Sequence, residues 1–339
     1  MVYIPFVSDS SIVGSAGAAA AASDSSASSG LGVLFARSTV AAFSALLVQS
    51  GLPSLTYPTD VTRGIVPKNI HSHNDYWRDV PVLDAISWGC RSIEADIHLI
   101  NGQLLVGHDR RSLSPERTLQ SLYLDPLMQL IKQRNPTAVA GEAGVTYENH
   151  IYESDSHPLQ LLLDYKTNGT ELHAAVLEAL QPFRDLPGVL ETYNASSPSN
   201  STATGRTPGV LTVTCTGNCP LSSVIAQSPS RDVFIDAPLL ELGDPQSEYD
   251  EATAGMWSMS WKKVPGSWSG EGVDGEGTKL GEIKKAVERA GAINVPVRLW
   301  ETPSWPAYKR DQIWRSLLAV SPTAPMYINA DNLEAAANL

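Results

Sequence analysis

Two carboxylates lie two positions apart in the segment Ser92-Ile-Glu-Ala-Asp-Ile97. Apolar residues alternate with them, so a β-strand would point Glu94 and Asp96 to the same side. If that side is the interior of a barrel, the two charges repel each other, and removing each from water costs roughly several kcal/mol. A cation between them would offset this cost, and an Arg or Lys on a neighbouring strand is the alternative.

A third acid lies in the segment Leu161-Leu-Leu-Asp-Tyr-Lys166, where Asp164 and Lys166 would share one face of a strand. One interpretation is that Lys166 simply neutralises Asp164. The other makes Asp164 a third cation ligand and Lys166 a contact for an oxyanion. Three carboxylates without a cysteine favour a hard cation, Mg²⁺ or Ca²⁺, over zinc or copper.

Histidines can transfer protons near neutral pH, because their ordinary pKa lies close to 7. His71 and His73 end one β-rich run, and His108 follows a hairpin signal at Asn101-Gly102. A lone histidine is usually structural. Here the order of histidine, acid pair and histidine is hard to explain by packing, and it indicates general acid and base catalysis.

The elements that must position these side chains follow a regular order. From about residue 67 onward, short β-rich runs alternate with helical patterns, which is typical of βαβ units and a parallel sheet. The predicted strands are Lys68–His73, Ser92–Ile97, Leu159–Tyr165, Val210–Cys215, Val233–Ile235, Met256–Trp261, Val295–Trp300 and Met326–Asn329. The predicted helices are Val82–Trp88, Pro126–Gln133, Glu171–Phe183, Glu282–Ala290 and Asp311–Leu318, and the predicted long loops are Asn194–Gly209 and Pro265–Gly277.

The N-terminal part differs in composition from the rest. Residues 1–30 are dominated by Ala, Ser and Gly and are predicted to be disordered. Residues 31–60 are more apolar, and residues 31–55 could pack on the domain as a helix or contact a membrane surface peripherally. A spanning helix is not predicted, since it needs about 18 or more nearly uncharged apolar residues and Arg37 interrupts the run. The catalytic domain is placed at residues 64–339.

The charge balance excludes one class of partner. The formal net charge is −12, with 24 Lys and Arg against 36 Asp and Glu. Proteins that grip nucleic acid over a wide surface rely on clustered Lys and Arg, so no nucleic-acid partner is expected. An anionic substrate must then be attracted locally, and a bound cation would do this.

Three cysteines are too few for a disulfide framework. Cys215 and Cys219 have a C-x-x-x-C spacing without a second pair for zinc, and they could form a disulfide in an oxidising compartment. Cys90 ends an apolar run and is expected in the core. The sequons at Asn168, Asn194 and Asn200 favour a secreted, secretory-pathway or membrane-associated protein.

Three motifs together resemble a known superfamily. They are His71-Ser-His-Asn-Asp75, Gly89-Cys-Arg-Ser-Ile-Glu-Ala-Asp96 and Asn101-Gly-Gln-Leu-Leu-Val-Gly-His-Asp109. The chain resembles the glycerophosphodiester phosphodiesterase and phosphatidylinositol phospholipase C-like superfamily. The stretch from His71 through Glu116-Arg-Thr-Leu-Gln-Ser-Leu-Tyr123 is similar to its fungal subgroup named for altered inheritance of mitochondria, and Val297–Thr302 and Tyr327–Asp331 resemble the last two barrel strands.

The resemblance implies an α/β fold, a (β/α)8 TIM barrel, here with a disordered or helical N-terminal extension. It also implies one divalent cation and two histidines acting as general base and general acid on a phosphodiester. By position, Glu94 and Asp96 match the metal-binding acids, His108 matches the second histidine, and Asp164 falls where glycerophosphodiester enzymes usually place Glu. The sequence lacks their His-Arg-Gly opening and the Glu-Asn-Thr that follows, so it leaves open the substrate and whether His71 or His73 is catalytic.

The sequence therefore predicts a metal-dependent phosphodiesterase, active as a monomer on a small phosphodiester or a phospholipid headgroup. The predicted site consists of Glu94, Asp96 and Asp164 around Mg²⁺ or Ca²⁺, of Lys166, His71, His73 and His108 as catalytic groups, and of Asn74 and Trp300 as substrate contacts. One rival is an amidohydrolase-like barrel in which His71 and His73 bind a transition metal. A second is a barrel that binds a phospholipid headgroup without turnover.

Overall fold

The structure is a computed structural model that describes residues 62–134, 150–153, 155–194, 205–227, 230–263, 279–320 and 325–339. The N-terminal segments 1–30 and 31–60, including the membrane contact expected of residues 31–55, lie outside the described residues. The loop expected at residues 265–277 and the sequon at Asn200 also lie outside them. Across the described ranges, no helix is both long and apolar enough to cross a bilayer.

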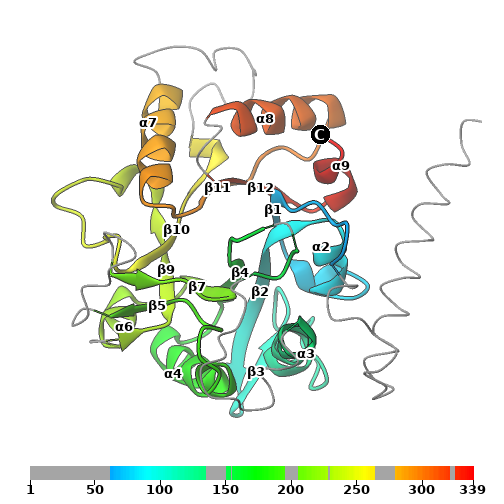
Figure 1. Cartoon of the computed structure of the whole chain (residues 1–339), viewed down its shortest axis with the longest axis vertical. Coiled ribbons are helices and arrows are strands. Elements are labelled where there is room, and N and C mark those ends of the chain that lie inside the picture. Colours follow the sequence, from blue (N-terminus) through cyan, green and yellow to red (C-terminus); the bar gives the residue numbers. More distant parts are fainter. Residues whose placement is uncertain are drawn as a thin grey trace, which may run out of the picture.

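Eight parallel strands form a closed barrel (Figure 1). They are β1 (Lys68–Ser72), β2 (Cys90–Ile100), β4 (Leu159–Tyr165), β7 (Leu211–Gly217), β9 (Val233–Pro238), β10 (Ala254–Ser260), β11 (Val297–Trp300) and β12 (Met326–Ala330). The barrel closes because β1 pairs in parallel with both β2 and β12. The (β/α)8 prediction is confirmed, and each predicted strand overlaps one barrel strand.

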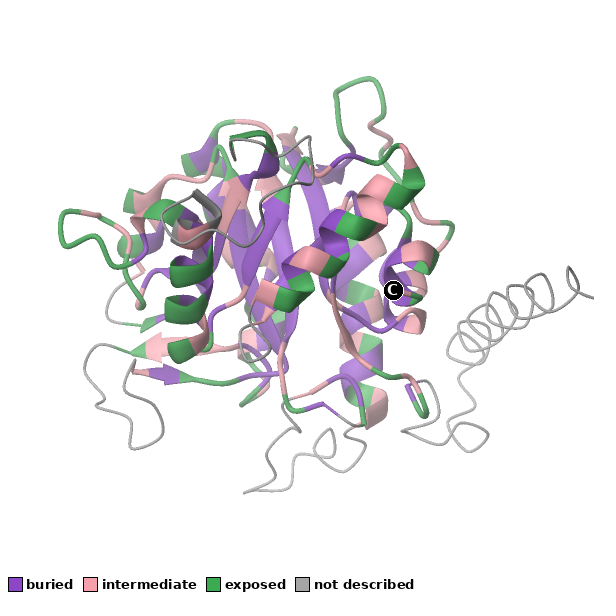
Figure 2. Cartoon of the chain, turned by 90° about the horizontal axis from the view of Figure 1, so that it is seen from above, coloured by how far each residue is buried: buried purple, intermediate pink, exposed green. Residues whose placement is uncertain are grey.

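Helices surround the barrel, and Figure 2 shows their exposed faces turned away from the buried strands. The helices are α2 (Leu83–Ser87), α3 (Asp125–Arg134), α4 (Gly169–Ala179), α5 (Gln181–Arg184), α6 (Leu221–Ile225), α7 (Lys279–Ala292), α8 (Ala307–Val320) and α9 (Leu333–Ala337). Short helical turns are η2 (Asp75–Trp77), η3 (Gln120–Leu124), η5 (Leu239–Glu241) and η6 (Trp261–Lys263). The predicted helix Glu171–Phe183 is split into α4 and α5, because Pro182 lacks a backbone N–H and lies in the first turn of the second helix.

The hairpin prediction is confirmed, whereas one predicted loop contains strands. Asn101 and Gly102 both have positive φ, 50° and 79°, and join β2 to the antiparallel β3 (Gln103–Val106). A small second sheet consists of β5 (Thr192–Asn194), β6 (Arg206–Thr207) and β8 (Ser230–Arg231). Part of the predicted loop Asn194–Gly209 belongs to this sheet. Strands of two or three residues are too short to show an alternating pattern.

In strand β2, residues that face the hydrophobic core alternate with residues that face the interior of the barrel. Ile93, Ala95 and Ile97 are fully buried in the hydrophobic core. Glu94 and Asp96 alternate with them and point into the barrel, where they are 4% and 1% exposed. The barrel interior is therefore polar near the carboxyl ends of these strands, as the spacing of the two acids predicts.

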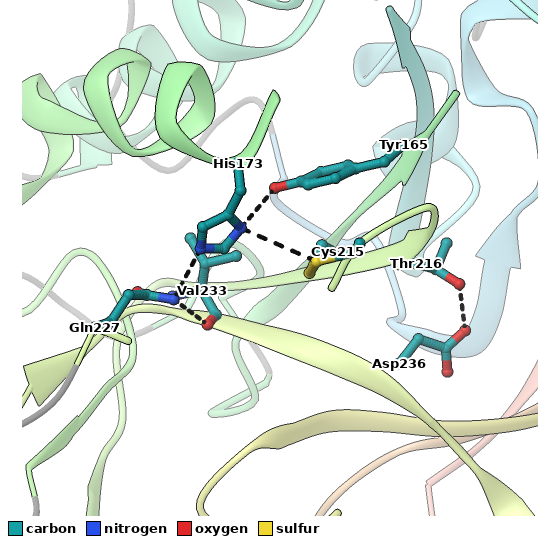
Figure 3. The surroundings of a disulfide bond; sticks show 8 residues. Tyr165, His173, Cys215, Thr216, Gln227, Val233 and Asp236 are labelled. Carbon is teal, nitrogen blue, oxygen red and sulfur yellow. Dashed lines mark hydrogen bonds between the residues drawn. A yellow bond between two sulfur atoms is a disulfide. The ribbon is translucent and has the colours of Figure 1, made fainter. Parts of the chain in front are cut away.

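Cys215 and Cys219 form a disulfide that joins β7 to the loop after it, and Cys90 is buried in the core. His173 of α4 lies beside the disulfide, with Nδ1 4.0 Å from Cys219 Sγ and 3.1 Å from the Tyr165 hydroxyl (Figure 3). The Gln227 amide oxygen accepts backbone N–H groups, so its nitrogen donates to His173 Nε2. This places the proton of neutral His173 on Nδ1. The two sulfurs bond each other and are not metal ligands.

We predict that replacing both cysteines, Cys215→Ala with Cys219→Ala, lowers the free energy of unfolding by about 2 kcal/mol, because the bond closes a loop of only about five residues. Urea unfolding of the full chain without reductant measures the difference. Unfolding the wild type in excess dithiol is the control, and it should bring the wild type to the stability of the variant. Equal stabilities without reductant would contradict this prediction.

Candidate active site

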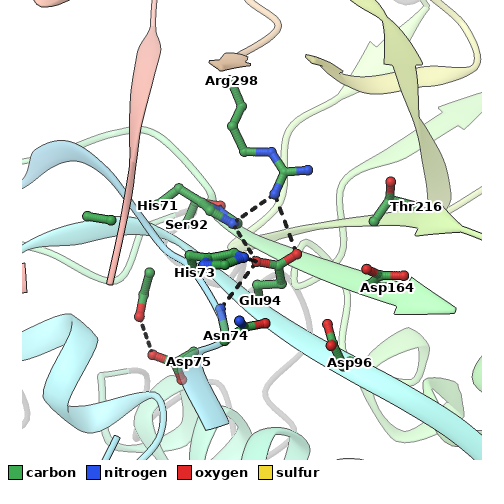
Figure 4. Close-up of polar contacts among 12 residues, drawn as sticks. His71, His73, Asn74, Asp75, Ser92, Glu94, Asp96, Asp164, Thr216 and Arg298 are labelled. Atoms are coloured by element: carbon green, nitrogen blue, oxygen red, sulfur yellow. Dashed lines mark hydrogen bonds and ion pairs between the residues drawn. The ribbon is translucent and has the colours of Figure 1, made fainter. Parts of the chain in front are cut away.

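The three predicted acids meet inside the barrel (Figure 4). Glu94 and Asp96 come from β2 and Asp164 from β4, and Asp96 lies directly opposite Asp164 in the register of the two strands. One oxygen of each carboxylate lies within 4.8 Å of the others. We call Glu94, Asp96 and Asp164 the carboxylate cluster.

The carboxylate cluster fits a hard divalent cation. Burial, together with the charges of Asp164 and Glu94, raises the pKa of Asp96 to about 6. Asp96 Oδ1 is buried and has no hydrogen-bond partner among the described residues. A cation would satisfy this oxygen and remove the repulsion that raises the pKa. Three oxygen donors of this kind suit Mg²⁺ or Ca²⁺.

Lys166 pairs with two members of the cluster. Its Nζ lies 2.6 Å from Asp164 Oδ2 and 3.1 Å from Asp96 Oδ2. Burial opposes the charge of Lys166, but the two carboxylates raise its pKa above the ordinary value. The lysine is therefore cationic in this site. A quarter of its side chain remains exposed.

Arg298 of β11 makes contacts that the sequence did not reveal. Its Nη1 lies 3.1 Å from His71 Nε2 and 3.5 Å from Glu94 Oε1, and its Nη2 lies 3.1 Å from Asp236 Oδ2. Arg298 is 5% exposed, and the side chain of Asp236 is 3% exposed. The signal in the sequence was a charged residue inside the otherwise apolar run Val-Arg-Leu-Trp that ends at Trp300.

His71 of β1 and His73, which directly follows β1, lie at different depths. His71 is fully buried, its Nδ1 lies 2.6 Å from Ser92 Oγ, and burial lowers its pKa to about 4. His73 lines the cavity, and a third of its side chain is exposed. Burial opposes protonation of His73, but its hydrogen bond to Asp331 at 2.7 Å and the charge of Glu94 raise its pKa. Of these two histidines, only His73 can contact a ligand in the cavity.

Asn74 and Tyr76 form hydrogen bonds to two members of the carboxylate cluster. Asn74 adopts a left-handed conformation with φ 47°, and its N–H donates to Glu94 Oε2 at 3.3 Å. The Tyr76 hydroxyl lies 2.8 Å from Asn74 Oδ1 and 2.9 Å from Asp96 Oδ2. Asn74 is 3% exposed and is not among the residues that line the cavity. Its contacts are those of a residue that positions the carboxylates.

His108 and Trp300 lie at different parts of the rim. His108 is exposed, and its ring lies 6.0 Å from that of Trp77. It is not among the residues that line the cavity, so the structure does not bring it to the cluster. Trp300 does line the cavity and is 36% exposed.

A cavity of about 550 Å³ opens over the cluster. Glu94, Asp164 and His73 form one side of it, and Arg298 and Asp236 lie among the deeper residues. A cavity with a few charged groups gathered in it is the usual form of a small-molecule site.

Residues 59–236 match the AIM6-like phosphodiesterase domain. This chain belongs to that family. The subgroup predicted from the sequence motifs is therefore confirmed. The chain is 38% identical over 291 residues to the altered inheritance of mitochondria protein 6 homolog of Arthroderma benhamiae, covering 84% of this chain and 87% of that one. It is 30% identical over 307 residues to the altered inheritance of mitochondria protein 6 of Candida glabrata, covering 82% of this chain and 72% of that one.

A solved structure of a glycerophosphodiester phosphodiesterase from Parabacteroides distasonis is also similar. The identity is 12% and the TM-score 0.42, with 80% of this chain and 97% of that chain covered. At this TM-score the likeness adds nothing to what the strand pairing of the barrel establishes.

Gly217 controls the space around Asp164. Its φ is +66°, and a Cβ at this position would lie 2.1 Å from Asp164 Oδ1. We predict that Gly217→Ala displaces this carboxylate and weakens Mg²⁺ or Ca²⁺ binding at least about tenfold. Isothermal titration calorimetry of the full chain with each cation measures the effect.

Gly102→Ala is the matched control, because Gly102 has a similar φ of +79° and a Cβ added there would meet nothing within 4 Å. Both substitutions carry a backbone cost of about 1 kcal/mol. Only Gly217→Ala touches a member of the carboxylate cluster. Equal cation affinity in the two variants would show that Gly217 has no role at the cluster.

Proposed function

We propose that this protein is a metal-dependent phosphodiesterase that uses histidine acid and base catalysis. The observation that carries the proposal is the convergence of three carboxylates within 4.8 Å of one another, two of which, Glu94 and Asp164, line one cavity with His73. Membership of the AIM6-like phosphodiesterase family supports the reaction class.

Glu94, Asp96 and Asp164 would hold one Mg²⁺ or Ca²⁺, which when bound supplies positive charge to a phosphate oxygen. Lys166 and Arg298 are the cationic side chains next to the cluster. Lys166 is a quarter exposed, and it can turn toward a second phosphate oxygen and stabilise charge that develops there. Arg298 is more buried and keeps Glu94 ionised, since its charge and the His71 hydrogen bond lower the pKa of Glu94 against the effect of burial.

His73 is the proposed general base. Its Nδ1 lies 2.7 Å from Asp331 Oδ1, so we assign the proton of neutral His73 to Nδ1. The lone pair of Nε2 is then free to take a proton from the attacking hydroxyl. That hydroxyl belongs either to water or to the substrate, in which case the product is a cyclic phosphate.

His108 is the proposed general acid, which protonates the leaving alcohol. The proposal rests on its position in the Gly-His-Asp motif after β3. Its ring is exposed and packs beside Trp77, on the loop that follows the hairpin. The proposal therefore requires a substrate whose phosphate lies at the carboxylate cluster and whose leaving group extends to His108.

The amidohydrolase-like alternative requires His71 and His73 to share one metal. His71 Nε2 instead lies 3.1 Å from both Glu94 Oε2 and Arg298 Nη1, and its Nδ1 faces Ser92. A guanidinium at that distance repels a metal ion from the same nitrogen. The geometry favours a carboxylate site.

We predict that Glu94→Gln with Asp96→Asn abolishes hydrolysis of bis(4-nitrophenyl) phosphate. A bound cation contributes several kcal/mol to such reactions, so kcat/KM should fall about a thousandfold or more. Chelation with EDTA should have the same effect on the wild type, and Mg²⁺ or Ca²⁺ should restore activity. Glu301→Gln is the control, because Glu301 pairs with Lys262 at the rim. Activity retained in the double variant would remove the proposal.

We predict that the effect of His108→Ala depends on the leaving group. A general acid contributes about 10²–10⁴-fold when an alkoxide leaves and little when 4-nitrophenolate leaves, since nitrophenolate needs no proton. Release of methanol from dimethyl phosphate and of nitrophenolate from methyl 4-nitrophenyl phosphate gives the two rates. His73→Ala should slow both reactions. An equal loss for the two substrates in His108→Ala would exclude this role.

A further inference from the structure

The cavity has two chemically different sides, and the order of the strands around the barrel explains them. β1, β2 and β4 are contiguous through the β1–β2 and β2–β4 pairings and supply His73, Glu94 and Asp164. β9, β10 and β11 are contiguous on the other part of the ring. They and the turn after β9 supply an apolar wall made of Pro238, Leu240 and Trp300.

Two large apolar side chains of the apolar wall are exposed to solvent. Leu240 is 50% exposed and Trp300 is 36% exposed. Exposed apolar side chains that line a cavity mark contact with an apolar ligand more often than those scattered over a surface. Leu239 is fully buried and anchors the turn η5 that presents Leu240.

The apolar wall begins directly above the ionic part of the cavity. Arg298 and Trp300 lie two positions apart on β11, so both point to the same side of the strand, about 7 Å apart along it. A phosphate at the depth of Arg298 and Glu94 would therefore place one ester oxygen at the foot of the wall. The wall leads from there toward the mouth of the cavity.

Two hydroxyls on this side already donate to carboxylates. The Ser258 hydroxyl donates to Asp236 at 2.7 Å, and the Ser260 hydroxyl donates to Glu301. Neither hydroxyl proton is available to a polyol or a nucleoside.

We propose that one ester arm of the substrate is a long alkyl or acyl-bearing chain that lies along Pro238, Leu240 and Trp300. The substrate is then a lipid phosphodiester, with its phosphate over the carboxylate cluster and its chain leaving the cavity along β9–β11. This inference rests on the proposed phosphodiesterase function and adds the class of substrate.

A homologous series of alkyl 4-nitrophenyl phosphates, from methyl to octyl and below micelle-forming concentrations, tests the wall. KM should fall about two- to fourfold for each added methylene, as apolar surface leaves water. kcat should stay nearly constant, because the chain contacts the wall equally in the ground and transition states. A KM that does not change with chain length overturns the inference while leaving the phosphodiesterase function intact.

Leu240→Ser with Trp300→Ala should flatten this dependence, so that the ratio of octyl to methyl KM approaches one. Leu318→Ser is the matched control, because Leu318 is a comparably exposed apolar residue, 37%, on α8 and is not among the residues that line the cavity. The control should keep the wild-type ratio. An unchanged ratio in the wall variant overturns the inference.

Binding of alkyl phosphate monoesters, methyl to octyl, separates this inference from the reaction itself. Calorimetry of the full chain with Mg²⁺ or Ca²⁺ gives the affinities without any turnover. If no ester is hydrolysed but affinity rises with chain length, the proposed reaction is wrong and the wall is supported. If affinity does not rise with chain length, the wall is excluded whatever the reaction.

Discussion

The repulsion among three carboxylates inside the barrel is the constraint on which this site depends. Their oxygens lie within 4.8 Å of one another inside the barrel. Counting the nearby Asp236, four carboxylates face two cationic side chains, Arg298 and Lys166. These two cationic side chains are fewer than the four carboxylates, and a bound divalent cation would offset part of the remaining negative charge. The pKa of Asp96 is raised, and its Oδ1 has no hydrogen-bond partner within the described part of the chain, so Asp96 is the member of the cluster that a cation would stabilise most directly.

The surrounding structure keeps these charges in place. Strand register sets Asp96 opposite Asp164, and Gly217 leaves room for the Asp164 carboxylate. The Asn74 N–H and the Tyr76 hydroxyl reach the other two acids from behind. A flexible site would let the carboxylates separate and lower their repulsion. These contacts prevent that, so the three carboxylates stay close together, as the proposed cation site requires.

Local patterns made the barrel and the cluster predictable from sequence. The two-residue spacing of Glu94 and Asp96 depends only on the strand period, and the hairpin at Asn101-Gly102 depends only on positive φ. Contacts across the barrel were not predictable in this way. Arg298 meets Asp236 only because β9, β10 and β11 are neighbours in the closed sheet. His71 and His73 share one strand face, and their depths differ because the barrel encloses His71 and leaves His73 at the mouth.

Arg298 links the two sides of the cavity. It belongs to β11, which also carries Trp300, yet its guanidinium reaches His71 on β1 and Glu94 on β2. A ligand against Trp300 would exclude water from the space above this guanidinium. Exclusion of water strengthens every charge interaction beneath it, including those of the carboxylate cluster with a cation and a phosphate. Apolar contact on β9–β11 would therefore act on the chemistry of β1–β4 through Arg298, and the two sides form a single site.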